Sequence, residues 1–127
     1  MKALSLWQPW AAAMAEGRKK NETRYWKTNY RGDLLICSAK RKCEEESLFL
    51  VFGAALCLVE LYDCVPTGSL KELTMLEASL GDYAPDRYAW LTRNLRRLKQ
   101  PVPVIGRQGI WIVPAEKEEQ ILAQLPC

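Results

Sequence analysis

Apolar residues along the chain fall into short blocks of strand length, bounded by polar, glycine or proline positions. The block at 32–38 (GDLLICS) is apolar enough for a central strand, and the block at 53–65 is the longest strand candidate. Strands are predicted at residues 3–7, 21–26, 32–38, 53–65, from 88–91 onward, and 108–113. The pattern therefore predicts five or six strands.

Other segments carry helix signals. Helices are predicted at residues 10–16, within 40–52, at 70–80 and at 115–125. The first is alanine-rich and ends before Gly17, a residue typical of helix C-termini. The second would be opened by the acids at Glu44–Glu46, and the third by Ser69 as N-cap with Glu72 at the capping-box position.

These elements predict an α+β fold, a small curved or partly closed β-barrel with short flanking helices. Pro101 and Pro103 lack the N–H that a continuous ladder needs, so the segment around them is predicted as a loop or a sheet edge. A length of 127 residues suits one domain over 1–127, and no internal repeat or linker interrupts it.

Composition narrows the function classes. Apolar residues make up 49% and charged residues 26%, as in soluble globular proteins. No apolar run approaches the ~20 residues that span a bilayer, and the N-terminus lacks a signal peptide's apolar core. We therefore expect a cytoplasmic protein without a membrane partner.

Histidine is absent, which excludes imidazole bases, acids and metal ligands. The five cysteines include no Cys-x-x-Cys pair, so neither a zinc ribbon nor a disulfide framework is predicted. Cys37 and Cys57 lie in apolar runs and are predicted to be buried free thiols. No metal or other cofactor is expected.

The charges are distributed unevenly, although the net charge is only +3. Residues 18–42 hold nine basic residues against two acids, and residues 87–107 hold six basic residues and no acid. Such clustering is typical of a surface that binds a polyanion, the alternative being solvated surface charges.

Several motifs occur together in a characteristic order. They are Leu4-Ser-Leu-Trp-Gln-Pro-Trp-Ala11, Gly17-x-Lys19-x-x-Glu22-x-Arg24-x-Trp26, Tyr30-Arg-Gly32, Ser38-Ala-Lys40, Tyr88-Ala-Trp90, Pro101-Val-Pro103 and Gly106-x-x-Gly109-x-Trp111. In this order the chain resembles the ASCH domain, a domain named after a transcription coactivator. Within that family it is similar to the coactivator-like branch in particular. The resemblance spans roughly residues 3–113 and implies a PUA-like β-barrel with a cleft beside the Gly17–Trp26 motif.

ASCH domains are generally proposed to bind RNA or other nucleic acids. Some small bacterial members resemble amidohydrolases that deacetylate N4-acetylcytidine, with a Lys and a Thr in the motif and a Glu further along. Lys19 matches that Lys, but Glu22 stands at the Thr position. Thr23 is one residue off, and on a strand this offset turns it to the opposite face. The departure weakens the hydrolase interpretation.

The motif residues suit a nucleobase or nucleotide. Arg24 and the nearby lysines would meet phosphate, Glu22 would accept from an exocyclic amino group, and Trp7 or Trp26 would stack on the base. Gln8 would read a base edge through its amide. The candidate ligand-binding residues are Trp7, Gln8, Lys19, Glu22, Arg24, Trp26 and Lys40. The alternative is that Glu22 and Arg24 form a structural ion pair.

The other tryptophans are assigned to the interior: Trp90 and Trp111 to the core, and Trp10 packed inward from its helix. If the chain is an enzyme, Lys19 and Glu22 are the candidate catalytic residues. A desolvated lysine near other cations can act as a base or nucleophile.

Three hypotheses therefore remain. The first is a domain that binds RNA, another nucleic acid or a nucleotide. The second is an amidohydrolase of acylated nucleosides, and the third is a protein-interaction module. The orientation of Glu60, on the longest strand, stays open.

Overall fold

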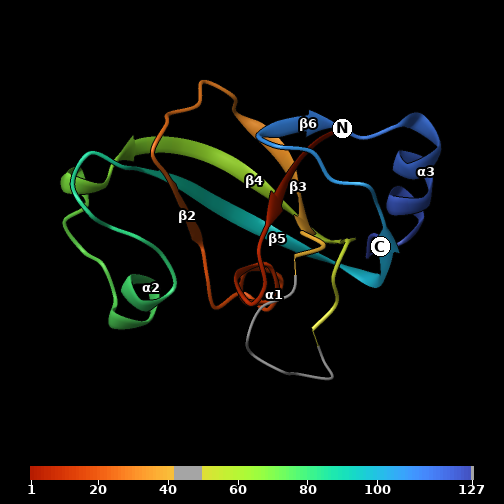
Figure 1. The fold of residues 1–127 in the computed structure, drawn as a ribbon, viewed down its shortest axis with the longest axis horizontal. Helices are drawn as coiled ribbons and strands as arrows, with labels where there is room; N and C mark the ends of the chain where they lie inside the picture. Colours follow the sequence, from red (N-terminus) through yellow and green to blue (C-terminus); the bar gives the residue numbers. More distant parts are fainter. Residues whose placement is uncertain (42–49, 127) are drawn as a thin grey trace.

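The computed structural model describes residues 1–41 and 50–126. In these residues six strands form one sheet in the spatial order β2-β5-β4-β3-β1-β6 (Figure 1). The strands are β1 (Lys2–Leu6), β2 (Asn21–Arg24), β3 (Gly32–Ser38), β4 (Ala54–Pro66), β5 (Tyr88–Pro103) and β6 (Ile110–Ile112). Neighbouring strands are antiparallel except β1 and β3, which run parallel. The predicted α+β class and strand number are confirmed.

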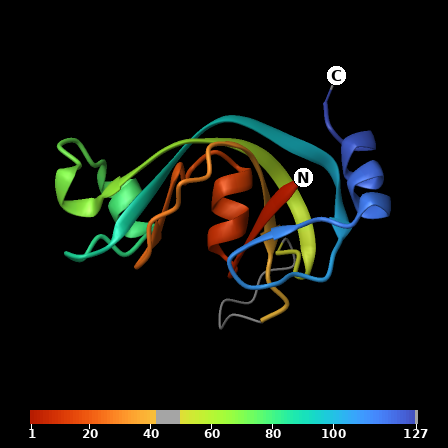
Figure 2. The ribbon, with the colours of Figure 1, turned by 90° about the horizontal axis from the view of Figure 1, so that it is seen from above.

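The long strands β4 and β5 curl strongly, and Figure 2 shows them arching over α1 (Trp10–Ala15). The ladder between them is interrupted at three places along β4, and such irregularities bend strands. The helix α3 (Ala115–Ala123) lies outside the arch. The result is an α+β half-barrel.

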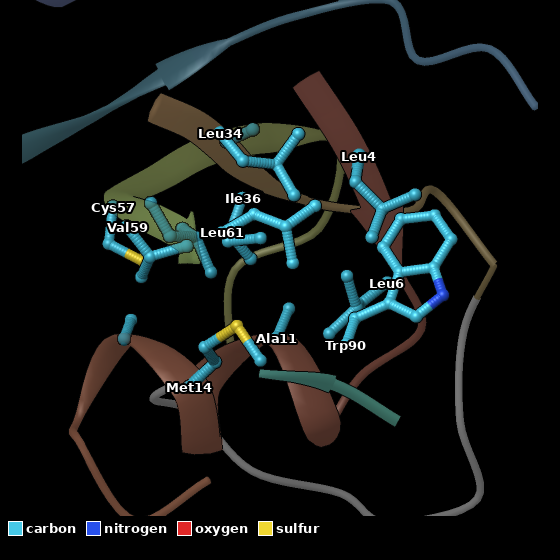
Figure 3. Close-up of a cluster of buried hydrophobic side chains, with 13 residues drawn as sticks. Leu4, Leu6, Ala11, Met14, Leu34, Ile36, Cys57, Val59, Leu61 and Trp90 are labelled. Atoms are coloured by element: carbon cyan, nitrogen blue, oxygen red, sulfur yellow. The ribbon is translucent and has the colours of Figure 1, made fainter. Parts of the chain in front are cut away.

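The sheet has an apolar cluster on each face, which explains the continuous apolar runs at 34–37 in β3 and 54–59 in β4. On the concave side, Met14 of α1 packs with strand residues such as Leu34 and Ile36 (Figure 3). Trp90 is fully buried in this cluster, as predicted. The second cluster includes Trp111, also predicted to be core, together with Ile121 of α3.

The helix predicted at 70–80 is shorter than expected. The α-helix α2 spans only Met75–Ser79, and its N-cap is Thr74, whose hydroxyl accepts a hydrogen bond from Glu77 N. The sequence offers two Ser/Thr-x-x-Glu signals in succession, and the second one forms the cap. Ser69 instead ends a 3-10 turn and donates to Pro66 O.

The segment around Pro101 and Pro103 belongs to β5, so the loop option was wrong and the edge option was right. There β5 pairs with β4 alone, because β2 reaches only the Tyr88–Leu91 part of β5. Because this part of β5 has a neighbouring strand on one side only, proline can be accommodated there although it has no N–H group to donate to a ladder. The helix predicted within 40–52 falls on residues 42–49, which lie outside the described residues.

Candidate functional site

The half-barrel does not close, and a cleft of about 1360 Å³ lies along the unclosed side. Its walls come from the ends of β1 and β3, from β2, from the segment 79–82 after α2, and from the loop 105–109 before β6. These segments are distant in the sequence, but the curl of the sheet brings the edge strand β2 opposite β1.

No described helix is both long and apolar enough to cross a membrane.

Arg24 connects the two sides of this cleft. Its Nη2 atom donates to the backbone oxygen of Ser5 on β1 (3.2 Å). The same guanidinium contacts Glu22, with Nε and Nη2 at 3.1 and 3.0 Å from Oε2. Both residues line the cleft and project from the same face of β2, as the spacing predicts. The predicted ion pair is therefore present at the cleft itself.

Lys19 is the third member of this charged group, and it contacts Glu22 from the protein interior. Gly17 leaves α1 in a left-handed conformation (φ 81°), a turn that glycine adopts without strain, and Lys19 follows it into the interior. The Lys19 side chain is 1% exposed. Its Nζ donates to Leu80 O (2.6 Å) and lies 3.4 Å from Glu22 Oε1. Lys19 does not line the cleft, and its amino group is committed to these two partners.

The segment 79–82 is held against β2 by polar contacts. Besides the bond from Lys19, Thr23 Oγ1 accepts from Asp82 N (3.0 Å). Arg87 donates to the backbone oxygens of Asp82 and Thr23, and its Nε lies 3.6 Å from Asp82 Oδ2. None of the residues of α2 is buried. This wall therefore depends on hydrogen bonds more than on apolar packing.

Three tryptophans line the cleft: Trp7, Trp10 and Trp26. The inward packing predicted for Trp10 was wrong, because it begins α1 at the rim and is 38% exposed while the alanines and Met14 are buried. Trp26 packs edge-on against Trp90, with ring centroids 4.6 Å apart. That contact fixes the orientation of the Trp26 ring beside the cleft.

Trp7 is half-exposed, and the guanidinium of a basic residue packs against its ring. The guanidinium of Arg41 lies 4.0 Å from the ring centroid, a cation–π contact. Arg41 is one of the nine basic residues of 18–42, and the structure gives it a direct contact with an aromatic residue of the cleft.

Two exposed basic residues, Lys40 and Arg107, line the cleft without an acidic partner among the described residues. Lys40 follows the end of β3, and its aliphatic stem runs over Gly53. A Cβ built on Gly53 would lie 3.1 Å from Lys40 Cγ, and the backbone of Gly53 is left-handed (φ 67°). Sequence reasoning missed Arg107, although the glycines at 106 and 109 mark its loop as a tight connection.

Gln8 takes a different place from the one expected. It is 2% exposed and does not line the cleft. Its amide nitrogen donates to Val51 O (2.8 Å), and its amide oxygen accepts from Ala12 N (2.9 Å). Both ends of the amide are thus used to hold α1, and none is left for a base edge.

The remaining polar candidates lie elsewhere or are engaged. Glu60 is paired with Arg93 (2.9 Å) outside the cleft, which settles its orientation. Arg96 forms two hydrogen bonds with Asp33 and so holds the pKa of that carboxyl below its usual value. Part of the basic stretch 87–107 is therefore neutralised by acids, while Arg87 and Arg107 reach the cleft.

Cys37 and Cys57 are buried free thiols, as predicted. Burial raises the pKa of each to about 12, which makes them unreactive as nucleophiles at neutral pH. In residues 1–41 and 50–126 no group of three or more His, Cys, Asp or Glu side chains is placed to hold a metal ion.

Comparison with known proteins identifies the class. The family model described as "ASCH domain" matches residues 4–102, so the chain belongs to the ASCH domain family. The crystal structure of ASCH from Zymomonas mobilis superimposes with a TM-score of 0.68 at 16% sequence identity, covering 98% of this chain and 95% of that one. This similarity confirms the PUA-like half-barrel.

Structures of two variants of the Zymomonas mobilis protein, one tyrosine-to-phenylalanine and one serine-to-alanine, each have a TM-score of 0.64 at 14% identity. They cover 98% of this chain, and 98% and 96% of theirs. Among curated proteins, human activating signal cointegrator 1 is 24% identical over 127 residues, which is 85% of this chain and 21% of that protein. The chain thus spans about a fifth of this relative's length.

Proposed function

We propose that this domain binds single-stranded RNA, or a nucleotide of such a strand, in the cleft on the open side of the half-barrel. The observation that carries the proposal is that three tryptophans line the same cleft as Lys40 and Arg107, two cations with no acidic partner in the described part of the chain. Aromatic faces that stack bases, next to cations that meet phosphates, are the usual means of binding single strands.

The size of the cleft supports a strand over a small metabolite. Its volume of about 1360 Å³ exceeds the ~300–1,000 Å³ of ordinary small-molecule pockets. The cleft is also open along the unclosed side of the half-barrel, so an RNA strand can enter and leave it. The exposed Trp7 and the fixed Trp26 would each offer a ring to a base.

The test is fluorescence anisotropy of a short labelled single-stranded RNA, titrated with protein at several salt concentrations. We expect binding whose affinity falls steeply with salt, because phosphate neutralisation releases counterions. Lys40→Ala should weaken binding and flatten the salt dependence by about 0.7 in the log–log slope, the loss of one phosphate contact. Lys99→Ala is the matched control, since Lys99 is exposed but lies outside the cleft.

No binding at low salt would contradict the proposal. A panel of acylated nucleosides would then test for hydrolysis. We place that activity second because the amino group of Lys19, its candidate nucleophile, is buried and engaged by Leu80 and Glu22. Binding of a protein with little salt dependence would instead favour an interaction module.

A further inference from the structure

The hydrogen bonds of Arg24 determine which part of a ligand it can contact. A guanidinium carries five N–H donors, and phosphates are usually bound by the fork that two neighbouring nitrogens form. In Arg24 the Nε hydrogen is directed to Glu22 Oε2, and Nη2 is shared between Glu22 Oε2 and Ser5 O. The fork of Nε and Nη2 is therefore occupied.

What remains is Nη1, which has no hydrogen-bond partner among the described residues, and the flat face of the guanidinium. The Arg24 side chain is 25% exposed and lines the cleft, and it reaches the backbone of Ser5 on the opposite side. Trp26, which follows the end of β2, lines the same cleft. Its charge is also offset by Glu22 at 3.0 Å, in contrast to Lys40 and Arg107, which have no described acidic partner.

We infer that Arg24 contacts the base of a bound nucleotide, by donating from Nη1 to a carbonyl oxygen or ring nitrogen, while Lys40 and Arg107 contact the phosphates. This inference rests on the proposed function. The Gly17–Trp26 motif would then supply base recognition, and the ends of β3 and the loop 105–109 would supply electrostatic attraction.

Lys19 and Glu22 act in this arrangement as positioning residues. Glu22 fixes the plane of the Arg24 guanidinium, and buried Lys19 holds Glu22 from the other carboxylate oxygen at 3.4 Å. Glu22 is 12% exposed, and each of its oxygens already faces a cation. Most of the motif's charge therefore serves to orient one donor group.

The experiment compares two probes, a short labelled single-stranded RNA and the same strand with its bases removed, which keeps every phosphate. Arg24→Ala should weaken binding of the complete RNA about tenfold, the effect of one hydrogen bond from a charged donor, and leave its salt slope unchanged. On the abasic strand Arg24→Ala should bind as the wild type does. Lys40→Ala, the matched phosphate-contact variant, should weaken binding of both strands.

Two further variants test the orientation of the donor. Arg24→Lys keeps the charge but loses the planar group, and should bind RNA as weakly as Arg24→Ala. Glu22→Gln should reduce RNA affinity in the wild-type background and have no further effect once Arg24 is alanine. Lys19→Met should behave in the same way, and Glu22→Gln keeps the test available if Lys19→Met does not fold.

Each contrary result has its own meaning. If Arg24→Ala flattens the salt slope, or weakens binding of the abasic strand as Lys40→Ala does, Arg24 is a phosphate contact and the inference is overturned while the proposed function stands. Full rescue by Arg24→Lys would also overturn it. If the wild type binds neither strand at low salt, the proposed function itself fails.

Discussion

Replacing Lys19 by methionine removes an ammonium group from the interior while keeping most of the side-chain volume. The charge-assisted hydrogen bond to Leu80 O (2.6 Å) contributes about 1.5–3 kcal/mol. Breaking a buried ion pair costs about 3–5 kcal/mol when it strands a charge. Here Glu22 keeps Arg24 at 3.0 Å, so that larger cost does not apply in full.

We therefore expect Lys19→Met to lower the free energy of unfolding by about 2–3 kcal/mol, measured by urea denaturation. For a domain of this size the loss corresponds to a decrease in Tm of about 10 °C. Lys20→Met is the control, because Lys20 is the exposed neighbour on the same turn and should change stability by less than about 0.5 kcal/mol. Equal stability of the two variants would refute a structural role for the buried ammonium.

Three further predictions concern stability. Trp90→Phe should lose about 2 kcal/mol in urea unfolding, since it leaves a void and removes the indole hydrogen bond to a backbone oxygen; an unchanged unfolding midpoint would contradict this. Gly53→Ala should cost about 1–2 kcal/mol through its left-handed backbone, and should weaken RNA binding by displacing Lys40. The folded pKa values of Cys37 and Cys57, raised from 9.0 to about 12, mean that the unfolded thiols ionise first. Stability should therefore fall by about 1.4 kcal/mol per thiol for each pH unit between 9 and 12, and unfolding curves of a double Cys→Ala variant should show a smaller decrease.

The strands were predictable because their signals are local. The bounds of β3 (Gly32–Ser38) follow directly from an apolar run between a glycine and a polar stretch, and β4 differs from its prediction by one residue at each end. The shared face of Glu22 and Arg24 follows from the two-residue period of a strand. Trp7, which was named with them as a candidate ligand-binding residue, lines the same cleft.

The parts that could not be predicted depend on contacts between distant segments. The residues near Trp10 in the sequence do not indicate that the curled sheet leaves its side chain exposed at the rim of the cleft. The hydrogen-bond partner of Lys19, Leu80 O, directly follows α2, a helix that is shorter than the sequence pattern predicts. The role of Gln8 was missed for the same reason, since Val51 is remote in the chain. Every residue carries the same backbone carbonyl group, so the sequence does not show which of them will accept a hydrogen bond from a side chain.

The position of β1 in the sheet has a consequence for folding kinetics. This strand precedes the other five described strands in the sequence, yet it lies between β3 and β6, and its residue Ala3 pairs with Trp111. Pairing over such sequence distances is slow because loop-closure entropy must be lost before contacts form. On the ribosome the loop 105–109, one wall of the cleft, cannot be anchored beside β1 until β6 has emerged. Ligand binding should therefore be acquired only after β6, the last of the six described strands, has been synthesised and has paired with β1.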